Sequence, residues 1–173
     1  MSDFKGKTIL ITGGTGSFGG YFVSYLLDKG FKEIRVFSRD ELKQEEMRLR
    51  LQNSLIKFHI GDVRDRDSVD DVMDGVDYAF HAAALKQVPT CEFFPMQATQ
   101  TNVIGSQNVI NSAISHGVSK VVSLSTDKAV YPVNALGITK ALMEKVVQST
   151  SRKLSEGKTV LSLVGYGNVL FSR

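Results

Sequence analysis

A short apolar run that ends in a glycine turn constrains the fold of this chain more than any other feature. Thr8–Ile11 is β-branched and apolar, so it is predicted to be a buried strand. Glycines follow at a spacing of three residues, and an amphipathic helix is expected to begin at about Ser17. Such a turn can bind phosphate, because glycine lets the backbone approach an anion and the first helical N–H groups favour negative charge. The candidate phosphate-binding residues are Gly13, Thr15, Gly16, Ser17, Phe18 and Gly19. A tight strand–helix turn without a ligand is the alternative interpretation.

Predicted strands and helices alternate along the rest of the chain. The alternation predicts right-handed crossovers, and the nearly continuous apolar strands indicate a sheet that is covered on both faces. We therefore expect a single α/β domain over residues 1–173, a Rossmann-type doubly wound parallel sheet of about six strands. Its later strands are predicted at 33–37, 55–60, 76–82, 119–125 and 159–164, and its helices at 18–29, 41–52, about 67–73, 98–116 and 136–153.

Composition excludes several classes of protein. The net charge is only +3 and no cluster of lysine and arginine stands out, which argues against nucleic-acid or membrane binding. Cys91 is the one cysteine, and neither a signal peptide nor a run of 18 apolar residues is present, so a cytoplasmic location is expected. The three histidines lack metal-ligand spacing, and no metal site is predicted.

The end of the second strand bears on the choice of cofactor. An acidic residue there usually binds the ribose diol of NAD, whereas an arginine suits the 2′-phosphate of NADP. Ser38 and Arg39 occupy this position, and Lys43 lies one turn further on. The pattern favours NADP, although Arg39 could also be a solvated surface charge.

Two further strand ends carry candidate cofactor residues. Asp62 and Val63 follow the third strand, where they could meet an adenine edge, although Asp62 could instead cap a helix. His81 ends the fourth strand and is interpreted as structural. Small side chains follow it and would let a cofactor pass close to the backbone; they are Ala82, Ala83 and Ala84.

The densest group of reactive side chains follows the fifth strand. Thr126, Asp127 and Lys128 supply a hydroxyl, an acid and an amine where open α/β sheets bind ligands. Lys140 lies on the next helix, where its charge could lower the pKa of a neighbour. Leu136 occupies the position, four residues earlier, that would suit a tyrosine acid–base group.

Six motifs that appear in order make the chain resemble a known family. They are TGGTGSFG, SRDELKQ, GDVRD, HAAALKQVP, TNVIG and STDKAVYPVNALGITK. Together they resemble the extended short-chain dehydrogenase/reductases, and more narrowly the C5-inverting UDP-N-acetylglucosamine 4,6-dehydratases of bacterial surface polysaccharide biosynthesis. The pairing of the fourth motif with the sixth is more specific than any single motif.

The resemblance implies a mechanism that uses bound NADP and a UDP-sugar substrate, UDP-N-acetylglucosamine or a similar one. Hydride leaves sugar C4, and the resulting ketone acidifies the C5 proton, which a base removes. An acid helps the C6 hydroxyl leave as water, hydride returns to C6, and a proton is delivered to C5 from the opposite face. Asp127 would be the acid, Lys128 the base, Thr126 a hydrogen-bond donor to the C4 oxygen, and Lys140 a ligand of the nicotinamide ribose.

The resemblance assigns three more residues and predicts an assembly. Asn102 and Lys86 would lie at the cofactor, and Lys86 and Asn168 near the substrate. The two long predicted helices, 98–116 and 136–153, pair across dimers in related proteins, so a homo-oligomer is expected.

Departures from the family pattern leave other functions open. Leu136 cannot take a proton, and Gly165 replaces the arginine of an R-Y-G-N segment. Family members are about twice as long and continue into a substrate-binding half, so this chain alone is expected to bind nucleotide without turnover. The alternatives are a non-catalytic NADP-binding module and a related NADP-dependent epimerase or reductase, against which the Asp127–Lys128 pair argues.

Overall fold

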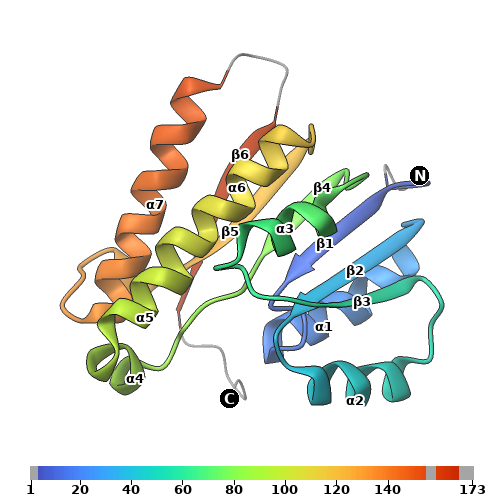
Figure 1. The fold of residues 1–173 in the computed structure, drawn as a ribbon, viewed down its shortest axis with the longest axis horizontal. Coiled ribbons are helices and arrows are strands. Elements are labelled where there is room, and N and C mark those ends of the chain that lie inside the picture. Colours follow the sequence, from blue (N-terminus) through green and yellow to red (C-terminus); the bar gives the residue numbers. More distant parts are fainter. Residues whose placement is uncertain (1–3, 155–158, 168–173) are drawn as a thin grey trace.

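Six parallel strands form one sheet in the computed structural model, which describes residues 4–154 and 159–167. Their order in the sheet is β3-β2-β1-β4-β5-β6, so the order reverses between β1 and β4 (Figure 1). This is the Rossmann-type sheet that the sequence predicts. The strands are β1 (Thr8–Thr12), β2 (Glu33–Ser38), β3 (Ile56–Ile60), β4 (Tyr78–His81), β5 (Lys120–Thr126) and β6 (Val160–Tyr166).

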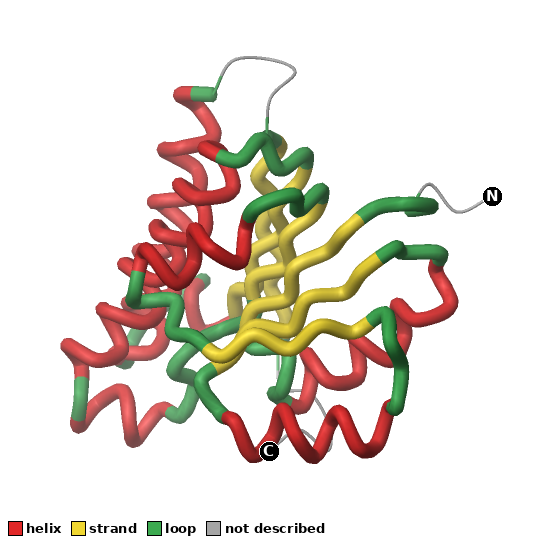
Figure 2. The backbone as a smooth tube through the Cα atoms, turned by 45° about the vertical axis from the view of Figure 1, so that its right-hand side comes forward, coloured by secondary structure: helices red, strands yellow, loops and turns green. Residues whose placement is uncertain are grey.

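Helices cover both faces of the sheet. Helices α1 (Ser17–Leu26) and α2 (Glu41–Leu51) lie on one face, and α3 (Arg66–Met73), α6 (Gly105–Ser115) and α7 (Ala135–Lys153) lie on the other (Figures 1 and 2). Side chains along β1 alternate between the two layers, which is the period of a strand. Leu10 packs with the α3 and α6 layer, whereas Ile9 and Ile11 pack with the α1 and α2 layer.

The predicted helix 98–116 is present, but it begins at Pro95 and is not α-helical throughout. Its first turns are α5 (Pro95–Thr99), a π-helical segment (Gln100–Ile104) follows, and α6 then begins at Gly105. The wider turn accompanies a Ser106 hydroxyl that donates to the Asn102 carbonyl, in competition with the helix ladder. Helix α4 (Val88–Phe93) was not predicted, because it is only six residues long and has a proline in its first turn.

Other element ends differ by a few residues. The N-cap of α3 is Asp65, which accepts from the Asp67 N–H, so this helix begins at Arg66, one residue before its predicted start. A 3₁₀ turn, Leu27–Lys29, follows α1, and Gly30 ends it with φ 86°, so the helical segment ends at Lys29 as predicted.

One edge of the sheet is uncovered on the α1 side within the described residues. Along β6, Leu161 and Leu163 face α7, whereas Val160 and Val164 are about half exposed. Among the described residues, no helix combines the length and apolar character that crossing a membrane requires.

Candidate functional site

A cleft of about 280 Å³ opens at the carboxyl ends of the strands, around the point where the strand order reverses. This is where open α/β sheets bind ligands. It brings together most of the residues predicted to hold the cofactor. Its lining comprises Gly13, Thr15, Gly16, Ser17, Phe18, Gly19, Phe37, Ser38, Arg39, Asp40, Lys43, Gly61, Asp62, Val63, Ala82, Ala83, Ala84, Lys86, Thr101, Leu124 and Tyr166.

The glycine turn approaches the floor of the cleft closely. Gly13 has φ 69°, and its N–H donates to the Phe37 carbonyl at 2.8 Å. A Cβ on Gly13 would lie 2.7 Å from the Ala83 nitrogen, and one on Gly19 would lie 2.5 Å from the Gly13 oxygen. Contact therefore requires glycine at both positions, and the left-handed conformation requires it at Gly13 as well.

The first turn of α1 is open toward the cleft. Its N-cap is Gly16, and no side chain of the described residues caps it. The first N–H groups of a helix lack intrahelical partners, so they remain available to an anion. The turn and the helix terminus together have the geometry of a dinucleotide phosphate site.

Each predicted 2′-phosphate cation has a carboxylate partner. Arg39 lies 3.5 Å from Asp62, and Lys43 lies 2.9 Å from Asp40. Asp40 also caps α2 by accepting from the Lys43 N–H at 3.0 Å. Burial raises the pKa of Asp62, but hydrogen bonds from Arg64 outweigh burial and hold that pKa below its usual value. Because Asp65 caps α3, the alternative of Asp62 as a helix cap is wrong.

A buried hydrogen-bonded row supports the cleft floor. Thr12 Oγ1 lies 2.7 Å from His81 Nδ1, and His81 Nε2 lies 2.8 Å from Ser106 Oγ. The Ser106 hydroxyl donates to Asn102, so His81 must donate from Nε2 and accept at Nδ1. Burial, and then the charge of Lys140, lower the pKa of His81 to about 3, so the ring is neutral.

Asn102, a predicted cofactor residue, does not line the cleft. It is fully buried, and its side chain accepts from the Leu85 N–H at 2.8 Å and donates to the Leu85 carbonyl at 3.0 Å. It also donates to Thr139 Oγ1 at 3.1 Å. Its contacts hold the loop after β4 against α7.

The reactive group after β5 lies beside the cleft but does not line it. β5 ends at Thr126, and a 3₁₀ turn, Asp127–Ala129, follows directly. Thr126 Oγ1 donates to Asp127 Oδ1 at 2.9 Å, and Lys128 Nζ donates to the same oxygen at 3.2 Å. The hydrogen bonds from Thr126 and then Lys128 hold the pKa of Asp127 below its usual value. Because strand pairing ends at Thr126, Asp127 and Lys128 are not in extended backbone, where neighbouring side chains would point to opposite faces. Both charged side chains can therefore approach the same substrate.

Lys140 is a buried residue of α7 whose side chain contacts β5. Its Nζ donates to the carbonyl of Leu124 at 2.8 Å, and Leu124 lines the cleft. Burial lowers the pKa of Lys140 to about 8. Leu136 is buried against Cys91 and Ala98, so the position expected for a tyrosine holds a core side chain.

Sequence reasoning missed several cleft residues, and one predicted residue lies outside the described ranges. Tyr166 of β6 stacks on Phe18 of α1 with ring centroids 5.8 Å apart. Local sequence patterns do not show this contact, because the two residues are far apart in the sequence. Asn168 lies outside the described residues. The cleft residues without a sequence prediction are Phe37, Asp40, Gly61, Thr101, Leu124 and Tyr166.

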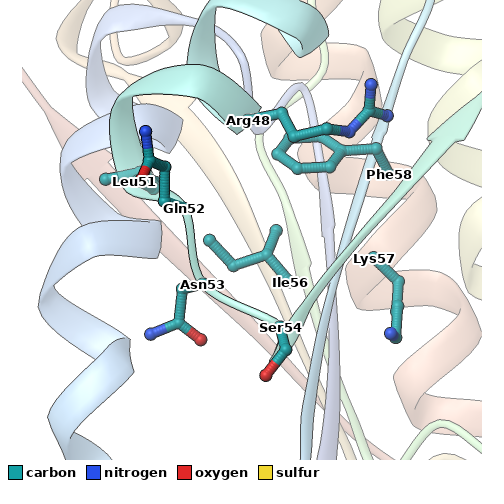
Figure 3. A pocket seen from close by; sticks show the side chains of 8 residues that line it. All are labelled: Arg48, Leu51, Gln52, Asn53, Ser54, Ile56, Lys57 and Phe58. Carbon is teal, nitrogen blue, oxygen red and sulfur yellow. The ribbon is translucent and has the colours of Figure 1, made fainter.

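A second hollow of about 280 Å³ lies far from these groups. It lies where α2 ends and β3 begins, between side chains that include Arg48, Gln52 and Phe58 (Figure 3). Ligands of such sheets bind at the carboxyl ends of the strands, so this hollow is not the candidate site. Within the described ranges, no group of three or more His, Cys, Asp or Glu side chains is arranged to hold a metal ion.

Comparisons with known proteins give the family. Residues 9–173 match the family described as polysaccharide biosynthesis protein. The chain is 59% identical to a UDP-glucose 4-epimerase of Rickettsia prowazekii (strain Madrid E), over 98% of this chain and 51% of the relative. The chain thus spans about half the length of the curated relatives it matches.

Solved structures agree with the fold. Pen from Bacillus thuringiensis is 40% identical with a TM-score of 0.96, over 99% of this chain and 53% of that one. The dTDP-glucose 4,6-dehydratase DesIV of Streptomyces venezuelae, solved with NAD and TYD, is 25% identical with a TM-score of 0.83, over 91% and 55%. The fold is therefore one that binds a nicotinamide dinucleotide, NAD or NADP, and the chain belongs to the polysaccharide biosynthesis protein family of extended short-chain dehydrogenase/reductases.

Proposed function

We propose that this chain is the cofactor-binding half of a C5-inverting UDP-N-acetylglucosamine 4,6-dehydratase that uses NADP. The observation that carries the proposal is the hydrogen-bonded group of Thr126, Asp127 and Lys128 at the end of β5. Loss of water from a sugar needs a base at one carbon and an acid at the next. A carboxyl group and an amine on one turn beside the cleft meet this need.

Each side chain has a distinct part in the proposed reaction. Bound NADP would supply the hydride chemistry at sugar C4 and C6, and a proton from solvent would return to C5 from the opposite face. Thr126 would donate to the C4 oxygen, and Lys128 would take the C5 proton. Asp127 would give a proton to the C6 hydroxyl, which leaves as water, and Lys140 would bind the nicotinamide ribose.

The protonation states in the substrate-free chain are the reverse of those that the reaction needs. Asp127 accepts from Lys128 as an ion pair, and its lowered pKa keeps it ionised at neutral pH. Burial of the pair under a sugar would disfavour both charges. Transfer of one proton from Lys128 to Asp127 would then give a neutral amine base and a carboxylic acid. Substrate binding would therefore convert Lys128 and Asp127 to the protonation states that the reaction needs.

The proposed preference for NADP depends on Arg39. Asp40 lines the cleft where an acid could bind the ribose diol of NAD, but its oxygens are engaged by the backbone and the side chain of Lys43. Arg39 is half exposed at the mouth, so its guanidinium can bind a 2′-phosphate.

A sugar 4-epimerase is the second candidate, because the relatives at 59% identity are named UDP-glucose 4-epimerase. A dehydratase forms a product lighter than its substrate by one water, whereas an epimerase forms an isomer of equal mass. The test joins this chain to the second half of the Rickettsia prowazekii relative and supplies UDP-N-acetylglucosamine or UDP-glucose in deuterium oxide. Mass loss with deuterium at C5 supports the dehydratase, and an isomer of equal mass overturns it.

Two further parts of the proposal concern the chain by itself. The 173-residue chain should bind NADPH in calorimetry but form no 4-keto sugar. If NADPH does not bind, the cofactor-binding role fails.

We also propose a homo-oligomer that forms through α7, where Ile138 and Leu142 are about half exposed. Sedimentation should show a dimer or larger species, and a monomer would contradict this.

A further inference from the structure

Glu144 is a partly buried carboxylate on α7 that has no part in the proposed reaction. It follows Lys140 by four residues, so the two side chains lie on the same helix face, one turn apart. Glu144 Oε1 accepts a hydrogen bond from the hydroxyl of Ser125, which is 4% exposed on β5. A carboxylate is therefore fixed near a buried ammonium.

The side chains of Lys140 and Glu144 form hydrogen bonds with two adjacent residues of β5. Leu124 accepts from Lys140 through its carbonyl, and Ser125 donates to Glu144 through its hydroxyl. Two contacts one helical turn apart fix both the height and the rotation of α7 against the end of β5. They therefore fix where the Lys140 amine lies relative to the cleft, which Leu124 lines.

The charges that act on Lys140 come from two elements. His81 faces it from β4, but that ring is neutral because its pKa is about 3. Glu144 acts from α7, and its negative charge raises the pKa of Lys140 against the larger lowering effect of burial. Within the described residues, these are the titratable groups with a resolved effect on or from Lys140.

A buried ammonium with one acceptor is costly, and it loses its proton unless a negative charge compensates. We propose that Glu144 is a positioning residue for Lys140: anchored by Ser125 one helical turn away, its carboxylate keeps the buried ammonium charged, so that the ammonium stays bound to the Leu124 carbonyl at the carboxyl end of β5. The inference rests on the proposed function, since that function assigns the nicotinamide ribose to Lys140. Neutral lysine could not donate all three N–H bonds or stabilise a nearby negative charge.

Three variants separate charge from anchoring. Glu144→Gln removes the charge but keeps an oxygen that can accept from Ser125. Ser125→Ala removes the anchor and keeps the charge. Glu46→Gln, on the exposed face of α2, is the matched control that removes a carboxylate elsewhere.

The first measurement is the titration of Lys140 in the cofactor-free chain, by NMR of lysine labelled with ¹³C at Cε, with Lys140→Arg to identify its signal. We expect a midpoint near pH 8 in the parent chain, because burial lowers the pKa of Lys140 to about 8. Glu144→Gln should lower this midpoint by about one pH unit, as a charge one turn away would at intermediate dielectric. Ser125→Ala should lower it less, and Glu46→Gln should leave it unchanged. A midpoint in Glu144→Gln equal to the control's overturns the inference.

The second measurement is NADPH affinity from pH 6.5 to 9, followed by nucleotide fluorescence. The charged lysine binds the ribose, so affinity should fall as pH rises through the Lys140 midpoint. In Glu144→Gln this fall should begin about one pH unit lower, giving about threefold weaker binding at pH 7.5. A shifted titration with an unshifted affinity profile refutes the ribose role of Lys140 and leaves its charge coupling to Glu144 standing. An unshifted titration refutes the coupling itself, whatever NADPH does.

Discussion

Gly13 and Gly117 offer a matched test of the close contact beneath the cleft. Both have φ 69°, so an alanine at either position meets the same unfavourable left-handed backbone. A Cβ on Gly117 would meet no atom within 4 Å, whereas one on Gly13 would lie 2.7 Å from the backbone nitrogen of Ala83. The pair therefore separates the cost of the conformation from the cost of contact.

The expected magnitudes follow from these two terms. The left-handed conformation costs an L-residue about 1–2 kcal/mol, which should be the whole loss of unfolding free energy in Gly117→Ala. A forced shift of packed backbone adds about 1–3 kcal/mol, so Gly13→Ala should lose about 2–5 kcal/mol. For a chain of this size, each kcal/mol corresponds to a fall of about 2–4 °C in Tm.

Urea unfolding, followed by circular dichroism, measures both losses, and calorimetry measures NADPH affinity. Gly13→Ala should lower affinity, because Gly13 and Ala83 both line the cleft, and Gly117→Ala should leave it near that of the parent. Equal losses of unfolding free energy in the two variants would show that the turn does not press on Ala83.

Four further substitutions test other groups. Arg39→Ala should reduce the preference for NADPH over NADH by about 1–3 kcal/mol in calorimetry, and an unchanged preference refutes its role. Asp62→Asn should increase that preference, because it releases Arg39, and a decrease contradicts the competition. The buried His81 has a pKa of about 3, below its unfolded value, so unfolding free energy should fall by about 1.4 kcal/mol per unit as pH drops from 6.5 toward 3. His81→Gln should lose this slope in urea titrations, and an unchanged slope would show that the ring is not buried neutral. In the fusion of this chain with the second half of the Rickettsia prowazekii relative, Lys128→Ala should abolish deuterium uptake at sugar C5, measured by mass spectrometry. Uptake at the parent rate would show that another group is the base.

The sheet and most of the cleft could be predicted because their signals are local in sequence. Each strand is a short apolar run, and each run ends in turn residues that the topology gathers at one edge of the sheet. Gly13, Arg39 and Asp62 follow three different strands, yet all line one cleft. The parallel arrangement alone places them together.

The segment between β4 and β5 was less predictable because tertiary contacts shape it. Helical periodicity over 98–116 does not show that the Asn102 side chain binds both backbone groups of Leu85. Those bonds hold Asn102 in the interior, although the family resemblance predicted it to be a cofactor ligand. A turn of π-helix at this point lies outside what periodicity can indicate.

The Arg39–Asp62 pair shows why cofactor selectivity could be predicted only in part. Sequence places an arginine after β2 and an aspartate after β3, but it does not show that the two lie 3.5 Å apart. An incoming 2′-phosphate must therefore compete with Asp62 for the guanidinium, and the gain from Arg39 is the difference between two ion pairs. Specificity is such a difference of affinities. NADH, which lacks the phosphate, would leave the existing pair intact, so Arg39 should set the choice between the cofactors through the affinity for NADPH alone.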